Sequence, residues 1–305
     1  MTDEQTPAAE PLRVGTHSGS FHADEVFALA TLRLVHGAIG IIRTRDADAL
    51  AQCDLRVDVG RKYDPKTGDF DHHQGDAGER PNGIRYASFG LVWRQFGAQL
   101  CGSESIAEEL DQTLVAPIDA GDNGQELVDL VFDGVGPYHL GRLIGSFGPQ
   151  WDDPDREAAE QQGFGDALML ADGILRREIA AAQAKARAVG LVRAAIKSST
   201  EGDPRIIEFD RGLPWKALVM AEAPDALVVI YPREKDWGIQ AVPADTGAFD
   251  NRKDLPEAWA GLEGAELQAV TGVPDATFCH IGRFMAVAGS REGALALARL
   301  AVNGD

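Results

Sequence analysis

The chain has 305 residues and a formal net charge of −19, with 44% hydrophobic and 25% charged residues. This composition is typical of a folded globular protein and excludes the disordered and fibrous classes, while the length predicts two domains. The acidity excludes extended binding along a nucleic acid duplex, which needs many basic side chains, and no apolar run reaches the roughly 20 residues of a transmembrane helix.

The chain begins with residues 1–11, which we expect to be a disordered tail. Its first ten residues contain three acidic and no basic residues, unlike secretory and organelle-targeting leaders. The three cysteines, Cys53, Cys101 and Cys279, are far apart and odd in number. They therefore predict neither a disulfide framework nor a thiolate metal site. Together these features predict a cytoplasmic protein.

An α/β domain is predicted over residues 12–153. Its apolar patterns indicate strands at Leu12–Thr16, Ala38–Thr44 and Leu55–Val59 and helices at Asp24–Val35 and Asp46–Gln52. Alternating strands and helices imply a mainly parallel sheet with right-handed crossovers, and ligands gather at the carboxyl ends of such strands. His17 and Asp58 fall at two of these ends.

A hairpin and further helices are expected to complete this domain. Residues 63–70 contain an Asp-Pro pair and a glycine, which predict a hairpin that delivers Asp71-His72-His73 at the end of its second arm. Helical patterns follow at Ser88–Leu100, Glu104–Val115, Gln125–Phe132 and Tyr138–Phe147.

A helical connector, residues 154–200, is expected to link the domains. Pro154–Ser198 is rich in Ala, Glu and Arg and has few strand formers, so it predicts one or two long helices, broken near Gly163-Phe164-Gly165. Residues 201–305 predict a smaller α/β or α+β domain that binds substrate. Its expected elements are strands at Ala217–Ala221, Ala226–Tyr231, Trp237–Val242 and Thr277–Ile281, and a helix at Arg291–Val302.

Four clusters of ionisable residues carry the candidate chemistry. They are Thr16–Glu25 with His17, His22 and Asp24; Val57–Gly60 with Asp58; Asp69–Gln74 with His72 and His73; and Ile118–Gly124 with Asp119 and Asp122. An aspartate within an apolar strand is costly to bury unless it is paired or binds metal. Imidazole and carboxylate without thiolate suit Mn²⁺, Fe²⁺ or Zn²⁺, and such ligands can hold two ions for phosphoryl hydrolysis. Composition and spacing alone leave two interpretations open: a metal site, or unrelated histidines and turn-capping aspartates.

The motifs extend over nearly the whole chain, from Leu12 to Val302. The first half contains Thr16-His17-x-Gly19-x-Phe21-His22-x-Asp24-Glu25, Asp58-Val59-Gly60, Tyr63-Asp64-Pro65, Phe70-Asp71-His72-His73-Gln74, Ser88-x-Gly90-Leu91-Val92 and Asp119-Ala120-x-Asp122-Asn123-Gly124. The second half contains Leu213-Pro214-Trp215, Trp237-x-Ile239-Gln240-x-Val242-Pro243, Leu255-Pro256-x-x-Trp259-x-Gly261-Leu262 and Phe278-x-His280. This ordered set resembles the melanocyte-proliferating-gene (MYG) family, which belongs to the DHH phosphoesterases, named for the Asp-His-His motif.

The resemblance implies a DHH-type catalytic domain with a binuclear centre of the manganese type, Mg²⁺ being the alternative ion. The implied metal ligands are His17, His22, Asp24, Asp58, His72, Asp119 and Asp122. Asp58 is the expected bridge, and Asp119 and Asp122 are alternatives for one position. His72, His73 and Asp58 are the catalytic candidates, and which of the two histidines is a ligand and which donates a proton stays open.

The resemblance also implies an activity, 3′-to-5′ exonuclease action on RNA or short oligonucleotides. Related phosphoesterases leave two alternatives: a pyrophosphatase or small-nucleotide phosphatase that uses the same site, and a non-catalytic nucleotide-binding protein. The chain departs from the family at His280–Ala286, where the glycines after a His-x-x-Gly-Phe stretch are displaced or lost. Arg252, His280 and Arg283 are predicted to bind substrate phosphate, because guanidinium suits phosphate oxygens. The alternative for each arginine is a surface residue in an irregular loop.

Overall fold

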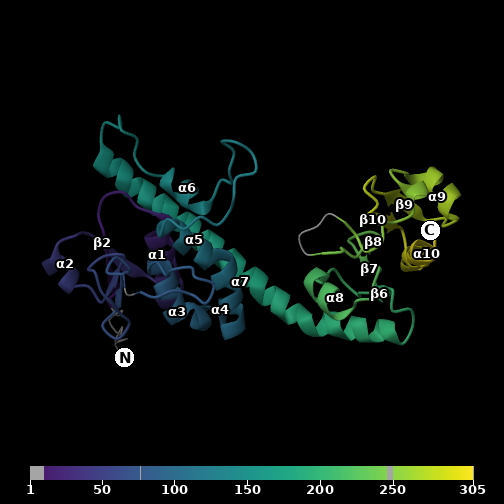
Figure 1. Cartoon of the computed structure of the whole chain (residues 1–305), viewed down its shortest axis with the longest axis horizontal. Helices are drawn as coiled ribbons and strands as arrows, with labels where there is room; N and C mark the ends of the chain where they lie inside the picture. Colours follow the sequence, from purple (N-terminus) through teal and green to yellow (C-terminus); the bar gives the residue numbers. More distant parts are fainter. Residues whose placement is uncertain (1–9, 76, 246–249, 305) are drawn as a thin grey trace, which may run out of the picture. The chain divides into compact units, whose positions relative to one another are not determined.

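The computed structural model describes residues 10–75, 77–245 and 250–304 of the chain (Figure 1). The chain forms two compact units, Met1–Gln183 and Ala184–Asp305. Each unit contains a five-stranded sheet with helices, so the predicted α/β class is confirmed. The expected tail, residues 1–11, lies outside the described residues except for its last two positions.

The first unit is built on a sheet with the strand order β2-β1-β3-β5-β4. Its strands are β1 (Leu12–Thr16), β2 (Ile39–Arg43), β3 (Leu55–Val57), β4 (Tyr63–Asp64) and β5 (Asp69–Phe70). β1 pairs in parallel with β2 and β3, and β3 pairs in parallel with β5. β4 and β5 form an antiparallel hairpin. The predicted parallel sheet and hairpin are therefore both present.

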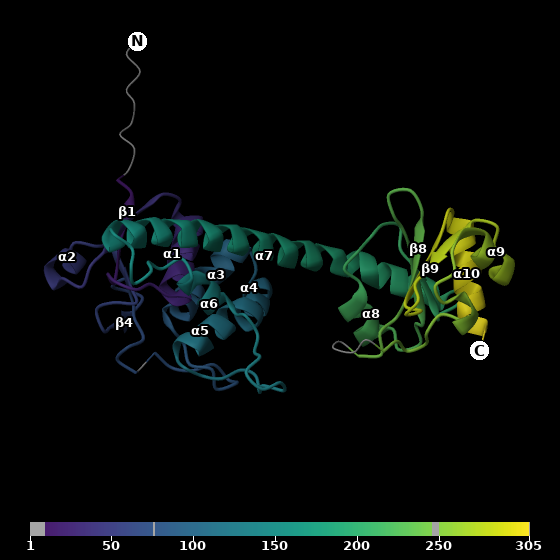
Figure 2. The same cartoon turned by 90° about the horizontal axis from the view of Figure 1, so that it is seen from above.

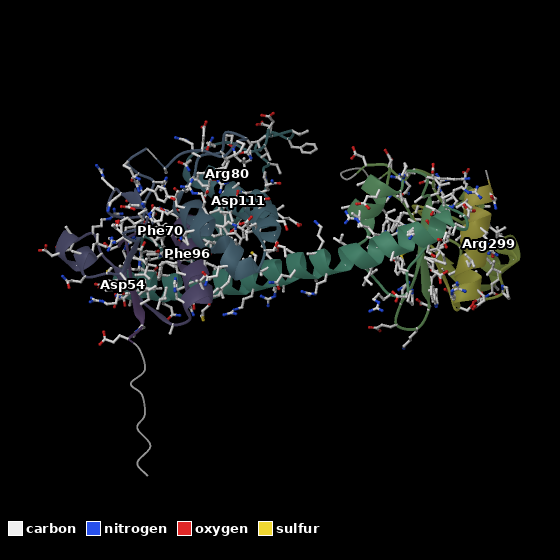
Figure 3. All side chains as sticks on the ribbon, turned by 90° about the horizontal axis from the view of Figure 1, so that it is seen from below. Asp54, Phe70, Arg80, Phe96, Asp111 and Arg299 are labelled. Carbon is white, nitrogen blue, oxygen red and sulfur yellow. The ribbon has the colours of Figure 1, made fainter. Side chains whose placement is uncertain are left out.

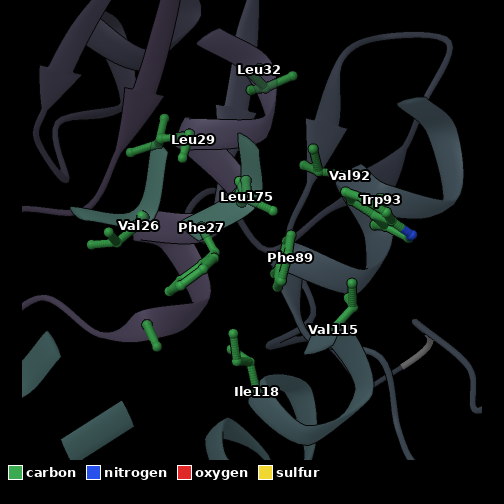
Figure 4. Close-up of a cluster of buried hydrophobic side chains, with 14 of the residues drawn as sticks. Val26, Phe27, Leu29, Leu32, Phe89, Val92, Trp93, Val115, Ile118 and Leu175 are labelled. Carbon is green, nitrogen blue, oxygen red and sulfur yellow. The ribbon is translucent and has the colours of Figure 1, made fainter. Parts of the chain in front are cut away.

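Most helices of the first unit, α2 excepted, pack their apolar faces into one core. They are α1 (Ala23–His36), α2 (Ala47–Ala51), α3 (Ser88–Cys101), α4 (Glu104–Leu110), the π-helical turn η1 (Asp111–Val115), α5 (Ala116–Asp122) and α6 (Leu140–Gly145). In Figure 4 Phe27 of α1 and Phe89 of α3 lie side by side, with their ring centroids 5.5 Å apart. Both rings are fully buried, so their contact holds α1 against α3 beside the sheet.

The long helix α7 (Arg156–Thr200) begins in the first unit and ends in the second (Figure 2). The break expected near Gly163 and Gly165 is wrong, because the helix is continuous. A Cβ atom at Gly163 would lie 2.0 Å from the carbonyl oxygen of Phe147. This glycine therefore allows the close approach of another segment and does not end the helix.

The second unit contains a mixed sheet with the strand order β6-β7-β8-β10-β9. Its elements are β6 (Ile206–Glu208), α8 (Lys216–Glu222), β7 (Val228–Pro232), β8 (Trp237–Ala241), the 3-10 turn η2 (Glu257–Trp259), α9 (Gly264–Thr271), β9 (Ala276–Cys279), β10 (Met285–Ala288) and α10 (Arg291–Asn303). β6 and β7 are parallel, and the other pairs are antiparallel.

Two further element predictions are wrong. The expected strand Ala217–Ala221 is helix α8, which buries Val219 and is followed by the buried cap residue Ala223, four positions further on. The expected helix Gln125–Phe132 is irregular, and its large apolar side chains are exposed. Isolated helical turns are unstable in water without an apolar face to bury, and here nothing covers that face. No helix of the described ranges is long and apolar enough to cross a bilayer.

Candidate metal centre

The candidate site begins where three neighbouring strands of the first sheet end. His17 follows β1, Asp58 follows β3 and Asp71 follows β5. The register pairs the last residues of these strands with one another. Parallel strands deliver the residues after their carboxyl ends to one edge of a sheet, so three separate motifs meet there.

Asp58 lies at the centre of this cluster and is almost fully buried. Its Oδ2 lies 3.3 Å from Nε2 of His17, and its Oδ1 lies 3.4 Å from Nε2 of His72 and 3.4 Å from Nδ1 of His73. Burial raises the pKa of this carboxyl, but the neighbouring imidazoles of His17 and His72 outweigh burial and hold the pKa well below its usual range. The backbone φ of Asp58 is 56°, a left-handed value that is strained for a residue with a side chain.

A first group of possible ligands joins Asp58 to His17, His22 and Glu25. Their candidate donor atoms all lie within 4.8 Å of one another. Glu25 was not among the predicted ligands, although its Oε1 lies only 3.2 Å from Nε2 of His17. Both of its oxygens accept hydrogen bonds from the backbone N–H of His22, at 2.9 and 2.8 Å. A glutamate in the first turn of a helix is normally a capping residue; its complete burial is the signal for a second role.

Two further groups lie on the other side of Asp58. One contains Asp58, His72 and His73, and the other contains Asp24, His72 and Asp122. Nε2 of His72 lies 3.0 Å from Oδ2 of Asp122. Asp58 belongs to two of the three groups and so does His72, so the groups are adjacent and share ligands.

Asp24 is held in place by the start of helix α3. Its carboxylate accepts hydrogen bonds from the backbone N–H groups of Ser88, at 3.0 Å, and of Phe89, at 2.7 Å. Burial raises its pKa well above the usual range, and the charges of Asp58 and Asp122 raise it further. A divalent cation would relieve this repulsion between buried carboxylates.

Asp119 and Asp122, the two alternatives on α5, have different surroundings. Asp119 is fully buried, accepts a hydrogen bond from the N–H of Gly90 at 3.0 Å, and lies 2.8 Å from Nη2 of Arg80. Arg80 also binds Asp111, at 2.7 Å (Figure 3). Among the described residues, Asp122 joins a group with metal-ligand spacing and Asp119 does not. The geometry favours Asp122 as the ligand and Asp119 as an anchor for Arg80.

Asp71, the first residue of the Asp-His-His motif, supports the loop that carries the two histidines. Its Oδ2 accepts a hydrogen bond from the N–H of Arg61 at 2.6 Å. Its Oδ1 accepts one from the N–H of His73 at 3.0 Å and lies 2.7 Å from the ring Nδ1 of His73. The side chain of His73 is 54% exposed, whereas that of His72 is 10% exposed. The two neighbouring histidines therefore occupy different environments.

The donor atoms fit a divalent cation. Nε2 of His17 and Nε2 of His72 are buried and form no hydrogen bond, although carboxylate oxygens lie 3.0 to 3.4 Å away. Buried polar atoms are rarely left in this state, and imidazole with carboxylate is a donor set for Mn²⁺ or Zn²⁺. Burial lowers the pKa of both histidines, but the surrounding carboxylates raise it to about 10 for His17 and about 11 for His72. These carboxylates attract positive charge strongly, whether a proton or a metal ion supplies it.

The groups open into one pocket of about 630 Å³ in the first unit. It is lined by Phe21, His22, Ala23, Asp24, Asp58, His72, His73, Thr113, Leu114, Pro117, Ile118, Gly121, Asp122, His139, Leu140, Gly141 and Gly145. His139 was not among the predicted site residues. It lies far along the chain from the recognised motifs, so no spacing pattern connects it with them.

The residues predicted to bind phosphate in the second unit have their own partners. The guanidinium of Arg252 donates to the backbone carbonyls of Met220, Ala223, Pro224 and Ala226, at 2.6 to 3.1 Å. These bonds favour a structural role and leave few of its donors for phosphate. Arg283 lies 2.7 Å from Oδ2 of Asp254 and has a left-handed φ of 55°. Nδ1 of His280 accepts a hydrogen bond from the N–H of Gly282. His280 and Arg283 thus share one turn, and Arg252 is bonded to another segment.

Comparison with known proteins identifies the family. The MYG1 exonuclease family model, described as "Uncharacterised protein family (UPF0160)", matches residues 13–302. The chain is 33% identical to the human protein named MYG1 exonuclease, over 95% of this chain and 85% of the human protein. It is 32% identical to the mouse MYG1 exonuclease, over 98% and 89% of the two chains, and 33% identical to the MYG1 protein of Chlamydia muridarum, over 92% and 93%. The chain therefore belongs to the MYG1 exonuclease family.

Proposed function

We propose that the chain is a divalent-cation-dependent phosphodiester hydrolase that removes nucleotides from the ends of RNA or short oligonucleotides. The observation that carries this proposal is the position of Asp58. Its two carboxylate oxygens face His17 on one side and His72 with His73 on the other. A carboxylate shared by two sets of ligands is the arrangement expected for a bridge between two cations.

The names of the mammalian relatives support this class of reaction. The human and mouse proteins are named exonucleases, and each aligns with at least 95% of the present chain. An exonuclease hydrolyses phosphodiester bonds from the end of a strand. We extend this activity to the present chain. The 3′-to-5′ direction and the preference for RNA belong to the same proposal and rest on the resemblance of the motifs.

Different side chains have different roles in the proposed reaction. Two Mn²⁺ ions at the three ligand groups would supply an activated water and stabilise charge on the phosphate. Asp58 and His72, which are shared between groups, hold the centre together. His73 is half-exposed at the pocket wall and is the best-placed donor of a proton to the leaving oxygen. Asp71, next to its Nδ1, would stabilise the protonated ring.

The lining of the pocket favours a nucleotide over inorganic pyrophosphate. Among the described residues, no lysine or arginine lines it, whereas Phe21, Leu114 and Ile118 do. Pyrophosphate offers only charged oxygens and is commonly bound by basic side chains. A nucleotide also offers a base and a sugar, which can pack against apolar walls.

The test is hydrolysis of a short oligoribonucleotide with Mn²⁺, labelled at either end in separate reactions. Release of single nucleotides from the 3′ end is the expected result, and inorganic pyrophosphate serves as the competing substrate. Asp58→Asn is the matched control, because it keeps the size of the side chain and removes the bridging charge. Hydrolysis of pyrophosphate alone, or equal activity of the variant and the parent, would contradict the proposal.

A further inference from the structure

One polar residue in the pocket is not explained by the ligand groups. His22, Asp24, Asp58, His72, His73 and Asp122 belong to those groups. The hydroxyl of Thr113 donates to the backbone carbonyl of Glu109 at 2.9 Å. Of the polar side chains that line the pocket within the described part of the chain, His139 alone remains free to contact a ligand. It is also the only lining side chain outside the ligand groups that can carry a positive charge.

The backbone of helix α6 fixes which nitrogen of His139 faces outward. His139 precedes α6, and its Nδ1 accepts a hydrogen bond from the backbone N–H of Arg142 at 3.3 Å. An accepting Nδ1 carries no proton, so the proton of the neutral ring is on Nε2. The ring is exposed and forms no ion pair with any carboxylate in the described ranges. Its Nε2–H is therefore a donor without a partner.

A cationic side chain, Arg142, lies one turn further along the same segment. The guanidinium of Arg142 lies over the ring of Tyr138, 5.3 Å from its centroid. Both side chains are exposed, and within the described residues Arg142 has no carboxylate partner. The protein as a whole has a net charge of −19 and therefore repels phosphate. Phosphates repelled by the general charge can be held only by such local donors.

We propose that the segment Tyr138–Arg142 is a phosphate-binding subsite for single-stranded oligonucleotides. Nε2–H of His139 donates to a non-bridging phosphate oxygen inside the pocket, and Arg142 contacts a neighbouring phosphate at the rim. Tyr138 offers an aromatic face on which a base can stack. This inference rests on the proposed function and adds to it the residues that position the strand. It places the phosphate contacts of the oligonucleotide in the same unit as the ligand groups.

The test uses the full-length protein with His139→Ser. Serine can still cap α6 by accepting the N–H of Arg142, so the variant removes the imidazole donor without removing the cap. His36→Ser is the matched control, since His36 is also an exposed histidine at a helix end and does not line the pocket. KM and kcat are measured with a short oligoadenylate, Mn²⁺ content by elemental analysis, and binding of the same labelled oligomer to metal-free protein by fluorescence anisotropy.

We expect His139→Ser to raise KM and the dissociation constant roughly 10- to 100-fold, the effect of losing one hydrogen bond to a charged group. The value of kcat, the Mn²⁺ content and the His36→Ser control should stay near those of the parent. Parental KM and affinity in His139→Ser, or loss of Mn²⁺ from it, would overturn the inference while leaving the proposed function intact. A parent that binds the oligomer without hydrolysing it would overturn the proposed function, and the affinities would still decide the subsite. A parent that does neither would overturn both.

Discussion

The two units of the protein differ in how their charged side chains are compensated. In the first unit, Asp24, Asp58 and His17 are buried and crowd toward one point, with a histidine nitrogen and carboxylate oxygens 3 to 4 Å apart. In the second unit, Arg252 is bonded to backbone carbonyls and Arg283 to a carboxylate. Burying like charges together is unfavourable unless a ligand compensates, whereas satisfied arginines need none. The difference supports the proposal that the first unit binds an ion, and it favours a structural role for these arginines in the second unit.

The largest effect should come from removing the shared carboxylate. Asp58→Asn keeps the shape of the side chain but removes the charge that faces three imidazoles. Loss of supporting residues around a metal commonly costs 10- to 100-fold in activity, so loss of the bridge should lower kcat by more than about 100-fold. Steady-state hydrolysis of an oligoribonucleotide in saturating Mn²⁺ measures it. A variant within about tenfold of the parent would show that the two sides of the cluster do not act as one centre.

Removal of metal should lower the stability of the first unit and leave that of the second unit unchanged. Dialysis against EDTA should abolish activity, and Mn²⁺ should restore it better than Ca²⁺, because imidazole is a poor ligand for Ca²⁺. Free Mn²⁺ at about 100 times its dissociation constant should add about 2.7 kcal/mol to the stability of the unit that binds it. Hydrogen exchange with and without Mn²⁺ should show added protection in residues 10–183. Added protection confined to residues 184–304 would place the ion in the other unit.

A pair of variants on α5 should distinguish a ligand from an anchor. Asp122→Asn should reduce bound Mn²⁺ with little change in the unfolding of the metal-free protein, since Asp122 is partly exposed. Asp119→Asn should lower stability by about 1–3 kcal/mol, because the buried Arg80 loses one of its two carboxylate partners. Elemental analysis and denaturant unfolding measure the two effects. The reverse pattern would exchange the roles of the two aspartates.

The smallest effects are expected for the arginines of the second unit. Arg252→Ala should destabilise that unit by about 1–3 kcal/mol, because partly buried carbonyl oxygens lose their donors. Arg283→Ala removes a half-exposed ion pair and should change stability by less than about 1 kcal/mol. If Arg283 contacts phosphate, its variant raises KM for oligonucleotides without changing Mn²⁺ content. If both variants were equally stable, Arg252 would not contribute more than Arg283 to the stability of the second unit.

In the first unit the sequence predicted the strand ends well, because apolar runs followed by histidine or aspartate leave few alternatives. In the second unit it missed β6 and β10. β1 has the predicted bounds, whereas the predicted strand Leu55–Val59 ends two residues early, at Val57, because Asp58 adopts a left-handed conformation. Glu25 was missed because its position in a helix is explained by capping alone. The sequence could not distinguish the roles of Asp119 and Asp122, since residues three positions apart on one helix lie on the same face and only packing against Arg80 distinguishes them. The irregular stretch after Asp122 has helical periodicity but no surface to cover it.

Two opposing effects act at position 58: the left-handed backbone favours glycine, whereas the contacts of the carboxylate favour aspartate. Glycine adopts this conformation freely, whereas a residue with a side chain loses about 1–2 kcal/mol there. Asp58→Gly would relieve that strain, but it would also remove a carboxylate whose pKa His17 and His72 hold well below the usual range. A carboxyl with a lowered pKa stabilises the fold at neutral pH. Directed evolution for heat resistance at neutral pH should therefore retain aspartate at position 58 even in a chelating medium, and glycine should appear there only at a pH low enough to protonate the carboxyl.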